Sequence, residues 1–270
     1  PCKTRRQRQM CIRDRIWIGP SPVAIEMMGD KMTARKTMKA ANVPVIPGEE
    51  IDFEDEEKMI AAIRQASERV GYPLLLKASS GGGGKGMRKV EAPDHLDEAI
   101  KGARREAIAA FGDGRVYVER LLTGSRHVEI QVLADQHGRT IHLGERECSV
   151  QRRHQKVFEE APCPVMTEQL RDAMGQAAVL AAQAVDYVGA GTVEFLLSST
   201  GEFFFLEMNT RIQVEHPVTE MVTGVDIVRE QLRIANGEPM SCGKLNIRGH
   251  SIEVRLYAED AANNFLPSIG

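Results

Sequence analysis

The segment of residues 207–220 holds the densest set of side chains that could do chemistry. It follows residues 203–206, an apolar run typical of a strand buried on both faces. Glu207, Asn209 and Arg211 alternate along the chain, so an extended backbone would project all three to one side. Carboxylate and amide oxygens beside a guanidinium suit metal ions and anionic substrates. The segment is therefore predicted to be a site for metals and anions rather than the solvated end of a strand.

A second candidate is the glycine-rich segment 79–86. Its Gly81, Gly83 and Gly86 satisfy the dinucleotide-binding spacing, but a strand pattern follows where that motif needs a helix to begin. The phosphate-binding P-loop is also excluded, because Gly86 rather than Ser or Thr follows Lys85. Neither nucleotide motif therefore explains the glycines.

The strand patterns on either side, at residues 72–77 and 87–90, indicate instead a β-hairpin with a glycine tip. Such a tip exposes backbone amides and can fold over phosphates as a lid. Lys77, on the strand before the tip, would direct a fixed charge at the same phosphates. An idle turn is the alternative for the glycines taken alone.

Around these segments strand hairpins alternate with helices, which favours an α+β fold with mostly antiparallel sheets. Thr167 is predicted to cap the best helix pattern. The predicted helices span residues 29–42, 53–70, 93–110, 167–187 and 225–235. The predicted strands span residues 72–77, 87–90, 116–121, 127–133, 140–144, 191–197, 202–208 and 250–257.

Composition limits the partners. The 270 residues carry a net charge of −3, so no overall field favours nucleic acid or a membrane. Five cysteines without paired metal spacing favour free thiols in a reducing cytoplasm. No apolar run is long enough to span a membrane, and a signal-peptide pattern is missing. Residues 1–15 are basic, and they are predicted to be a disordered or foreign stub rather than a nucleic-acid-binding arm.

A glycine-tipped hairpin, a lysine on the strand before it and two acids on adjacent strands, Glu194 and Glu207, together resemble the ATP-grasp fold. A more specific similarity, from about residue 18 to residue 270, is to biotin carboxylase. The segments that carry it are 28–31, 77–86, 126–131, 149–156 and 207–220. The resemblance implies an α+β, ATP-grasp fold in which two lobes with largely antiparallel sheets grip ATP.

The resemblance also implies an activity, the carboxylation of biotin that begins the reaction of biotin-dependent acyl-CoA carboxylases. ATP would phosphorylate bicarbonate to carboxyphosphate, which would deliver CO2 to biotin on a carrier protein. The implied cofactors are ATP and Mg²⁺ or Mn²⁺. The implied partners are a biotin carboxyl carrier domain, a carboxyltransferase and, in the intact enzyme, a second copy in a homodimer.

Catalytic roles follow from the same resemblance. Glu215 matches the general base that removes the bicarbonate proton. Arg255 matches an arginine that stabilises the biotin enolate. The residues that match the bicarbonate contacts are Arg211, Gln213, Val214 and Lys156. The residues that match the metal ligands are Glu194, Glu207 and Asn209.

The nucleotide site is assigned in the same way. Glu119, Arg120 and Leu122 match the hinge that reads adenine, with Arg120 where relatives often have Lys. Glu129 shares a strand pattern with His127 and has a similar claim, or is a solvated strand charge. The residues that match ATP contacts are Lys31, Lys77, Gly82, Gly83, Gly84, Gly86, Met87, Glu119, Arg120, Leu122, His127, Gln151 and His154.

The domain prediction is an ATP-grasp core over residues 16–270, with a glycine-lid subdomain over about 71–122. Members of the family carry a Rossmann-like domain ahead of this core and a longer C-terminal lobe. The chain is therefore expected to lack the first domain and to stop within the C-terminal lobe.

Two other functions stay open. Another ATP-grasp carboxylate ligase would also form an acyl phosphate, and its independence of biotin would reveal it. A truncated module could bind MgATP without turnover.

Overall fold

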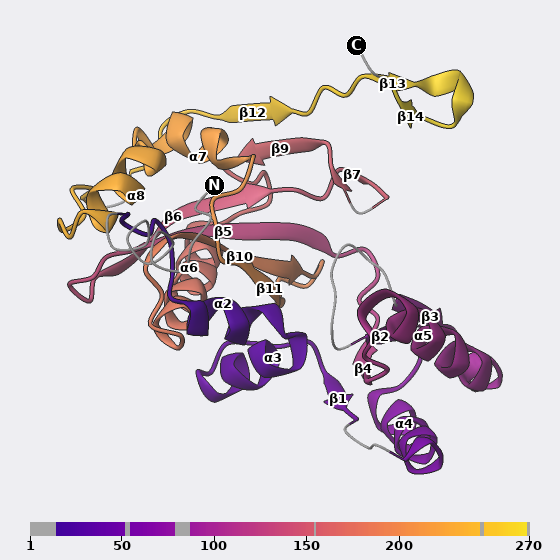
Figure 1. Cartoon of the computed structure of the whole chain (residues 1–270). Coiled ribbons are helices and arrows are strands. Elements are labelled where there is room, and N and C mark those ends of the chain that lie inside the picture. The colour runs from indigo at the N-terminus through magenta and orange to yellow at the C-terminus, as the bar shows by residue number, and fades with distance from the viewer. Residues whose placement is uncertain (1–14, 52–54, 79–86, 154, 244–245, 269–270) are drawn as a thin grey trace, which may run out of the picture.

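The computed structural model describes residues 15–51, 55–78, 87–153, 155–243 and 246–268 (Figure 1). Outside them lie residues 1–14 of the basic stub and, among the predicted ATP contacts, Gly82, Gly83, Gly84, Gly86 and His154. The described residues form a six-stranded sheet, a four-stranded sheet and two short two-stranded pairs. Neighbouring strands pair antiparallel, so the predicted α+β fold with antiparallel sheets is confirmed.

The larger sheet has the strand order β11-β10-β5-β6-β9-β12. Helix α6 (Glu168–Gln183) packs on one face, and Met174, Ala178 and Ala182 of the helix join the core there. Thr167 accepts a hydrogen bond from the Leu170 amide and caps this helix, as predicted. The strands are β5 (Arg126–Ala134), β6 (Thr140–Glu147), β9 (Phe158–Ala161), β10 (Gly189–Leu197), β11 (Phe203–Asn209) and β12 (Ser251–Val254).

The opposite face of this sheet is polar although it is buried. Side chains alternate along a strand, so even positions of β5 reach the α6 core and odd positions face the other way. Helix α7 (His216–Thr223) packs over β6, β9 and β12 on that other side. The buried polar residues on it include Glu129, Gln131, Arg146, Thr192 and Glu194.

The smaller sheet has the order β1-β4-β2-β3, with helices α4 (Glu56–Val70) and α5 (Leu96–Phe111) against it. Ile63 of α4 and Ile100 of α5 meet Leu76 of β2 in a separate core. Lys77 lies opposite Met87, which confirms the predicted hairpin on either side of the glycine segment. The strands are β1 (Gly48–Glu50), β2 (Leu74–Ala78), β3 (Met87–Val90) and β4 (Val116–Arg120), and the short helix η1 (Pro93–His95) precedes α5.

Two helices were not predicted. The helix expected over residues 29–42 is α3 (Lys31–Ala40), and Asp30 caps it by accepting a hydrogen bond from the Thr33 amide. Helix α2 (Pro22–Gly29) precedes this helix and was not predicted. Helix α7 was not predicted at all, while α8 (Ile227–Ala235) matches the expected helix over 225–235.

The remaining elements are short, and in Figure 1 the last of them extend away from the larger sheet. They are β7 (Gln151–Arg152), β8 (Gln155–Lys156), β13 (Glu259–Asp260), η2 (Ala261–Asn263) and β14 (Leu266–Pro267). Among the described residues, none of the helices has the length and apolar character needed to cross a membrane.

Candidate active site

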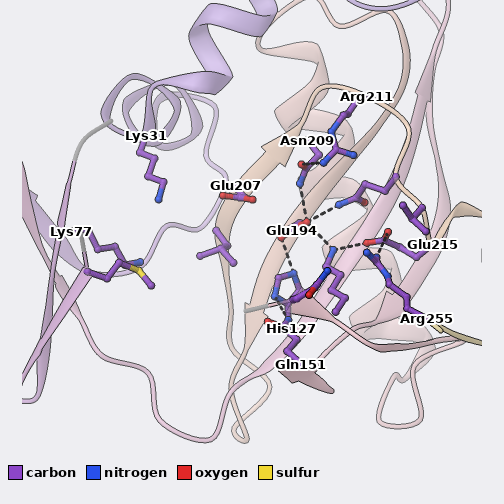
Figure 2. A pocket seen from close by; sticks show the side chains of 16 residues that line it. Lys31, Lys77, His127, Gln151, Glu194, Glu207, Asn209, Arg211, Glu215 and Arg255 are labelled. Carbon is purple, nitrogen blue, oxygen red and sulfur yellow. Dashed lines mark hydrogen bonds and ion pairs between the residues drawn. The ribbon is translucent and has the colours of Figure 1, made fainter. Parts of the chain in front are cut away.

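A cavity of about 350 Å³ opens between the two sheets (Figure 2). It gathers most of the predicted site residues, together with Gln155 and Leu206, which were not predicted. The predicted residues that line it are Lys31, Lys77, Met87, His127, Gln151, Lys156, Glu194, Glu207, Asn209, Arg211, Gln213, Val214, Glu215 and Arg255.

Two lysines line the cavity, Lys77 from the smaller sheet and Lys31 from α3, which contacts β11 of the larger sheet. Lys31 is the first residue of α3, and in Figure 2 it points toward Glu207. Burial lowers the pKa of Lys31, and the negative charge of Glu207 opposes that shift. Lys77 is buried on β2 and pairs with Glu119, which also binds Arg35 through Nη1 at 3.1 Å. Both ammonium groups are thus positioned for an anionic ligand such as a polyphosphate.

The residues predicted to read adenine do not line this cavity. Glu119 and Arg120 end β4, and Leu122 follows it. The Glu119 carboxylate is engaged by Lys77 and Arg35, so its side chain fixes a lysine of the cavity. The adenine role of these three residues stays a prediction.

The predicted metal ligands stand on adjacent strands. Glu194 of β10 lies opposite Glu207 of β11, and the Asn209 amide donates to Glu194 Oε1 at 2.8 Å. Burial and the neighbouring charge of Glu194 raise the pKa of Glu207. A divalent cation would relieve this repulsion, and carboxylate and amide oxygens are the ligands that Mg²⁺ prefers. The donor set therefore fits a magnesium or manganese ion.

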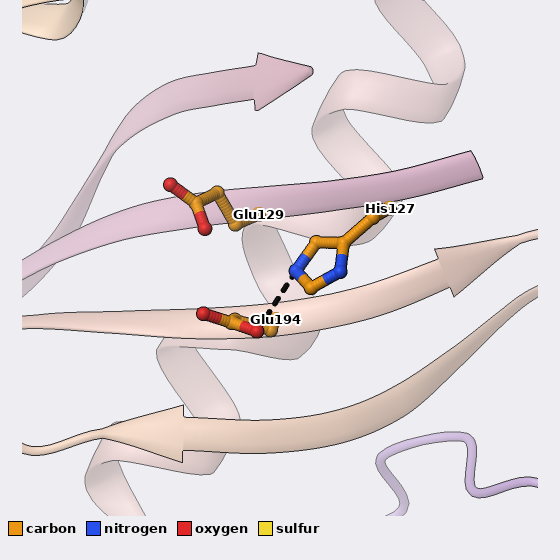
Figure 3. Close-up of side chains that lie close together, drawn as sticks. All are labelled: His127, Glu129 and Glu194. Atoms are coloured by element: carbon orange, nitrogen blue, oxygen red, sulfur yellow. Dashed lines mark ion pairs between the residues drawn. The ribbon is translucent and has the colours of Figure 1, made fainter. Parts of the chain in front are cut away.

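A second group of acids with one histidine could also suggest a metal centre (Figure 3). His127, Glu129 and Glu194 offer ligand atoms within 4.8 Å of one another. However, His127 Nε2 already pairs with Glu194 Oε2 at 2.8 Å, and Glu129 binds two cations of the protein. The ion pairs account for this group without a metal.

His127 is fixed from both sides. Its Nδ1 is 3.1 Å from Gln151 Nε2, and Nε2 faces Glu194. Burial would lower the pKa of His127, but Glu194 and Glu129 raise it above its usual value. Conversely, burial opposes ionisation of Glu194, yet His127 and Lys156 lower the pKa of Glu194 to about 2.

Lys156 is the centre of the carboxylate cluster. Its ammonium binds Glu129, Glu194 Oε1 at 2.9 Å and Glu215 Oε1 at 2.7 Å. These acids come from β5, from β10 and from the residue before α7. Burial opposes the charge of Lys156, but the carboxylates raise its pKa far above the usual value. The three carboxylates therefore favour the charged form of Lys156, which holds three segments together.

The predicted base and the predicted enolate-stabilising arginine are in direct contact. Glu215 is buried, and its Oε2 accepts from Arg255 Nη2 at 2.9 Å while Oε1 binds Lys156. Arg255 Nε also donates to Glu159 Oε1 at 2.8 Å. The Glu215 carboxylate is thus clamped between two cations at the wall of the cavity.

Strand β11 ends at Asn209, so the extended backbone that would project Glu207, Asn209 and Arg211 to one side does not reach Arg211. Arg211 still reaches the cavity, where Nη2 lies 3.4 Å from Asn209 Oδ1. The Gln213 amide donates to Glu194 Oε1 at 2.7 Å. Val214 lines the cavity just before α7. With Lys156, all four predicted bicarbonate contacts therefore line the same cavity.

Two buried residues behind this wall change the sequence interpretation. Glu129 is fully buried and bound by Arg146 and Lys156, so it is not a solvated strand charge. Arg146 was missed, because it lies between Glu145 and Glu147 in a run that reads as an exposed strand end.

Comparison with known proteins identifies the fold. The family described as the carbamoyl-phosphate synthase L chain, ATP binding domain, matches residues 30–242. The chain belongs to this family. The resemblance to biotin carboxylase and the ATP-grasp fold predicted from it are confirmed.

Relatives within this ATP-binding family are close. The biotin carboxylase of Nostoc sp. is 53% identical over 256 residues, which are 94% of this chain and 56% of that protein. A biotin carboxylase–β-γ-ATP complex from Campylobacter jejuni superposes with a TM-score of 0.87 at 42% identity, over 98% of this chain and 59% of that one. The biotin carboxylase domain dimer of Hydrogenobacter thermophilus 2-oxoglutarate carboxylase, in complex with MgADP, ADP and bicarbonate, gives 0.87 at 44% identity, over 98% and 58%. The chain thus spans little more than half the length of these relatives.

Proposed function

We propose that this chain catalyses the ATP-dependent carboxylation of biotin by bicarbonate. The observation that supports it most is the position of Glu215. Lys156 and Arg255 clamp this carboxylate in the same cavity as Lys31 and Lys77. A base, an anion site and a polyphosphate site within one cavity match a reaction that phosphorylates bicarbonate.

The first step forms carboxyphosphate. Glu215 accepts the bicarbonate proton, and the freed oxygen forms a bond to the γ-phosphorus of ATP while the bond to the β,γ-bridging oxygen breaks. ADP carries away the electron pair of that bond. Lys31 and Lys77 bind the phosphates, and Arg211 with Gln213 orients the planar bicarbonate. Glu194, Glu207 and Asn209 would hold Mg²⁺ or Mn²⁺, which neutralises phosphate charge when bound.

The second step transfers CO2. Carboxyphosphate breaks its carbon–oxygen bond to give CO2 and phosphate, and phosphate accepts the N1 proton of biotin. The N1 nitrogen then bonds to the carbon of CO2, while Arg255 stabilises the negative charge on the biotin oxygen. Arg255 directly follows β12 and lines the cavity beside Glu215.

The wider assembly is part of the proposal. Biotin would arrive on a carboxyl carrier domain and leave for a carboxyltransferase, since relatives include subunits of larger carboxylases. A homodimer is supported by the dimer of the Hydrogenobacter thermophilus domain. Cys148, Cys163 and Cys242 are free thiols among the described residues, which supports a reducing compartment such as the cytoplasm.

The test is ADP release by the chain with MgATP, with bicarbonate and then free biotin added. The expected result is stimulation that requires both additions and falls on the order of a thousandfold in Glu215→Gln. Glu98→Gln, on the exposed side of α5, is the matched control and should behave as the unmodified chain. Turnover with another acid and without biotin would indicate a different ATP-grasp ligase, and MgATP binding without turnover would contradict the proposal for this chain.

A further inference from the structure

Arg146 is a cation at the centre of the larger sheet that no predicted role uses. It lies on β6, and among the described residues it is the largest side chain that is completely buried. A buried guanidinium is costly unless its donors are paired. The number and identity of its partners therefore indicate what it does.

All five N–H donors of the Arg146 guanidinium have an acceptor. Nε donates to Glu129 Oε1 at 2.6 Å, the one carboxylate in the set. The other acceptors are Gln131 Oε1 at 2.7 Å, Thr219 Oγ1 at 3.0 Å, Thr192 Oγ1 at 3.1 Å and Gln213 Oε1 at 3.0 Å. They come from β5, from β10, from α7 and from the segment between β11 and α7. One side chain thus joins four parts of the fold.

Two of these partners connect Arg146 to the cavity. Gln213 accepts from Arg146 through its oxygen, so its amide nitrogen is directed at Glu194, 2.7 Å away. Glu129 accepts from Arg146 with one oxygen and from Lys156 with the other. Arg146 does not line the cavity itself, so any effect on bound ligands passes through these neighbours.

The charges explain why an arginine is needed behind Lys156. Lys156 faces three carboxylates, Glu129, Glu194 and Glu215. Arg146 compensates the charge of Glu129, which leaves Lys156 shared with Glu194 and Glu215 at the wall. Without Arg146, Glu129 would bind Lys156 as its only cation and draw the ammonium away from the cavity.

We propose that Arg146 is a positioning residue for bicarbonate: it neutralises Glu129 and fixes the Gln213 amide, and so holds Lys156 and Gln213 where the anion binds. This inference rests on the proposed function, because it concerns the same bicarbonate site. None of the five hydrogen bonds of Arg146 goes to Lys31 or Lys77, so the proposal concerns bicarbonate binding and not the phosphate contacts.

The variant Arg146→Lys keeps the charge but offers three donors in place of five, without the planar fork. We expect kcat/KM for bicarbonate in ADP release to fall on the order of tenfold or more, with KM for MgATP within about twofold of the unmodified value. Arg64→Met, which removes an exposed arginine that pairs with Asp97, is the matched control. An equal loss for both substrates, or unchanged bicarbonate dependence, would overturn the proposal.

The double variant Arg146→Met with Glu129→Gln tests the electrostatic half of the argument. Arg146→Met alone leaves Lys156 as the remaining ion-pair partner of Glu129, so kcat/KM for bicarbonate should fall further than in Arg146→Lys. Removing the carboxylate charge as well should restore part of kcat/KM, because Lys156 is no longer drawn to Glu129. Purely additive losses would contradict the assigned coupling. Circular dichroism identifies any variant that fails to fold.

A chain without bicarbonate-stimulated turnover would refute the proposed function, and Arg146 would then be tested by NMR. Lys156 is held by three carboxylates, so its ammonium should give a protected Nζ–H signal, assigned by its loss in Lys156→Arg. The signal should move in Arg146→Met and return toward its original position in the double variant. A signal that stays in place in Arg146→Met would overturn the positioning role independently of catalysis.

Discussion

The two walls of the cavity are built on different principles. On the larger sheet, carboxylates and cations alternate in a network that runs from Arg146 through Glu129 and Lys156 to Glu215 and Arg255. On the smaller sheet, Lys77 has one buried acid, Glu119, as its partner. We call the network on the larger sheet the crowded wall and the Lys77–Glu119 side the sparse wall. The crowded wall fixes the positions of its side chains through many simultaneous contacts, and the sparse wall leaves ammonium charge available to a ligand. The anion site is therefore preorganised, whereas the phosphate site depends on its ligand for neutralisation.

The strongest way to break the crowded wall is Lys156→Met. Glu129, Glu194 and Glu215 would lose their common cation. Each keeps one other partner, but removing one member of a buried ion pair typically costs about 3 to 5 kcal/mol. We expect a comparable fall in the free energy of unfolding, measured with urea, and loss of bicarbonate-stimulated ADP release. Lys101→Met, on the exposed side of α5, is the control. A fall below about 1 kcal/mol would show that the wall does not depend on this lysine.

The second-largest expected effect is destabilisation of the crowded wall at acidic pH. The pKa of Glu194 is lowered to about 2, and that of Glu129 is also lowered, by Arg146 and Lys156 against the effect of burial. A lowered folded-state pKa contributes stability above the unfolded value near 4.3, and this contribution is lost as pH falls toward 2. We expect a loss of about 2 to 3 kcal/mol in the free energy of unfolding between pH 5 and pH 2 from Glu194. Equal urea midpoints at pH 5 and pH 3 would argue against the assigned ion pairs.

A substitution in the sparse wall should weaken MgATP binding rather than the bicarbonate-dependent step. Lys77→Met removes a phosphate contact, so the Kd for MgATP should rise on the order of tenfold, as measured by titration calorimetry. Lys89→Met changes an exposed lysine of the same small sheet and should leave the Kd unchanged. A similar rise in both variants would mean that general charge, and not the position of Lys77, sets the affinity.

The smallest expected effect is a gain in stability, in the variant Glu159→Gln. Glu159 and Glu253 are opposite one another on β9 and β12, and each has one buried oxygen without a hydrogen-bond partner among the described residues. Burial raises the pKa of Glu159 despite Arg255, so its ionised form is penalised in the folded state. Glu159→Gln should therefore add about 1 kcal/mol to the free energy of unfolding at neutral pH.

The pH dependence checks this explanation. A raised folded-state pKa means that the penalty is complete above the folded value and vanishes below the unfolded one near 4.3. The gain from Glu159→Gln should therefore shrink as pH falls toward 4. A gain that is constant from pH 7 to pH 4 would exclude relief of the carboxylate charge as its cause.

The sequence was informative wherever local pattern and chemistry coincide. The hairpin around residues 79–86, the Thr167 cap and the sheet class follow from periodicity and turn residues, and they are confirmed. Helix α7 was missed although Pro217 near its start and Gly224 at its end are ordinary helix signals, because the segment was interpreted only for its chemistry. Helix α2 was also missed, although Ser21 caps it and Pro22 begins it, which are ordinary helix signals.

The site shows a sharper limit. Residues that touch the cavity could be predicted, because carboxylates, amides and lysines in a specific motif resemble a known family. Arg146 could not, since its environment is made by β5, β10 and α7, which are distant in sequence. A charged residue between two acids carries no local sign of complete burial. The burial of a polar residue depends on tertiary packing, which cannot be predicted from the local pattern of a single sequence.

The five paired donors of Arg146 have a consequence for how the molecule opens. Separating β5, β10 or α7 from β6 would strand a guanidinium or its acceptors in the interior, so none of these segments can detach cheaply by itself. Backbone amides of these segments should therefore exchange with solvent deuterium as one cooperative unit, at a free energy near that of global unfolding. The smaller sheet has its own apolar core, and it is free to exchange through separate, easier openings.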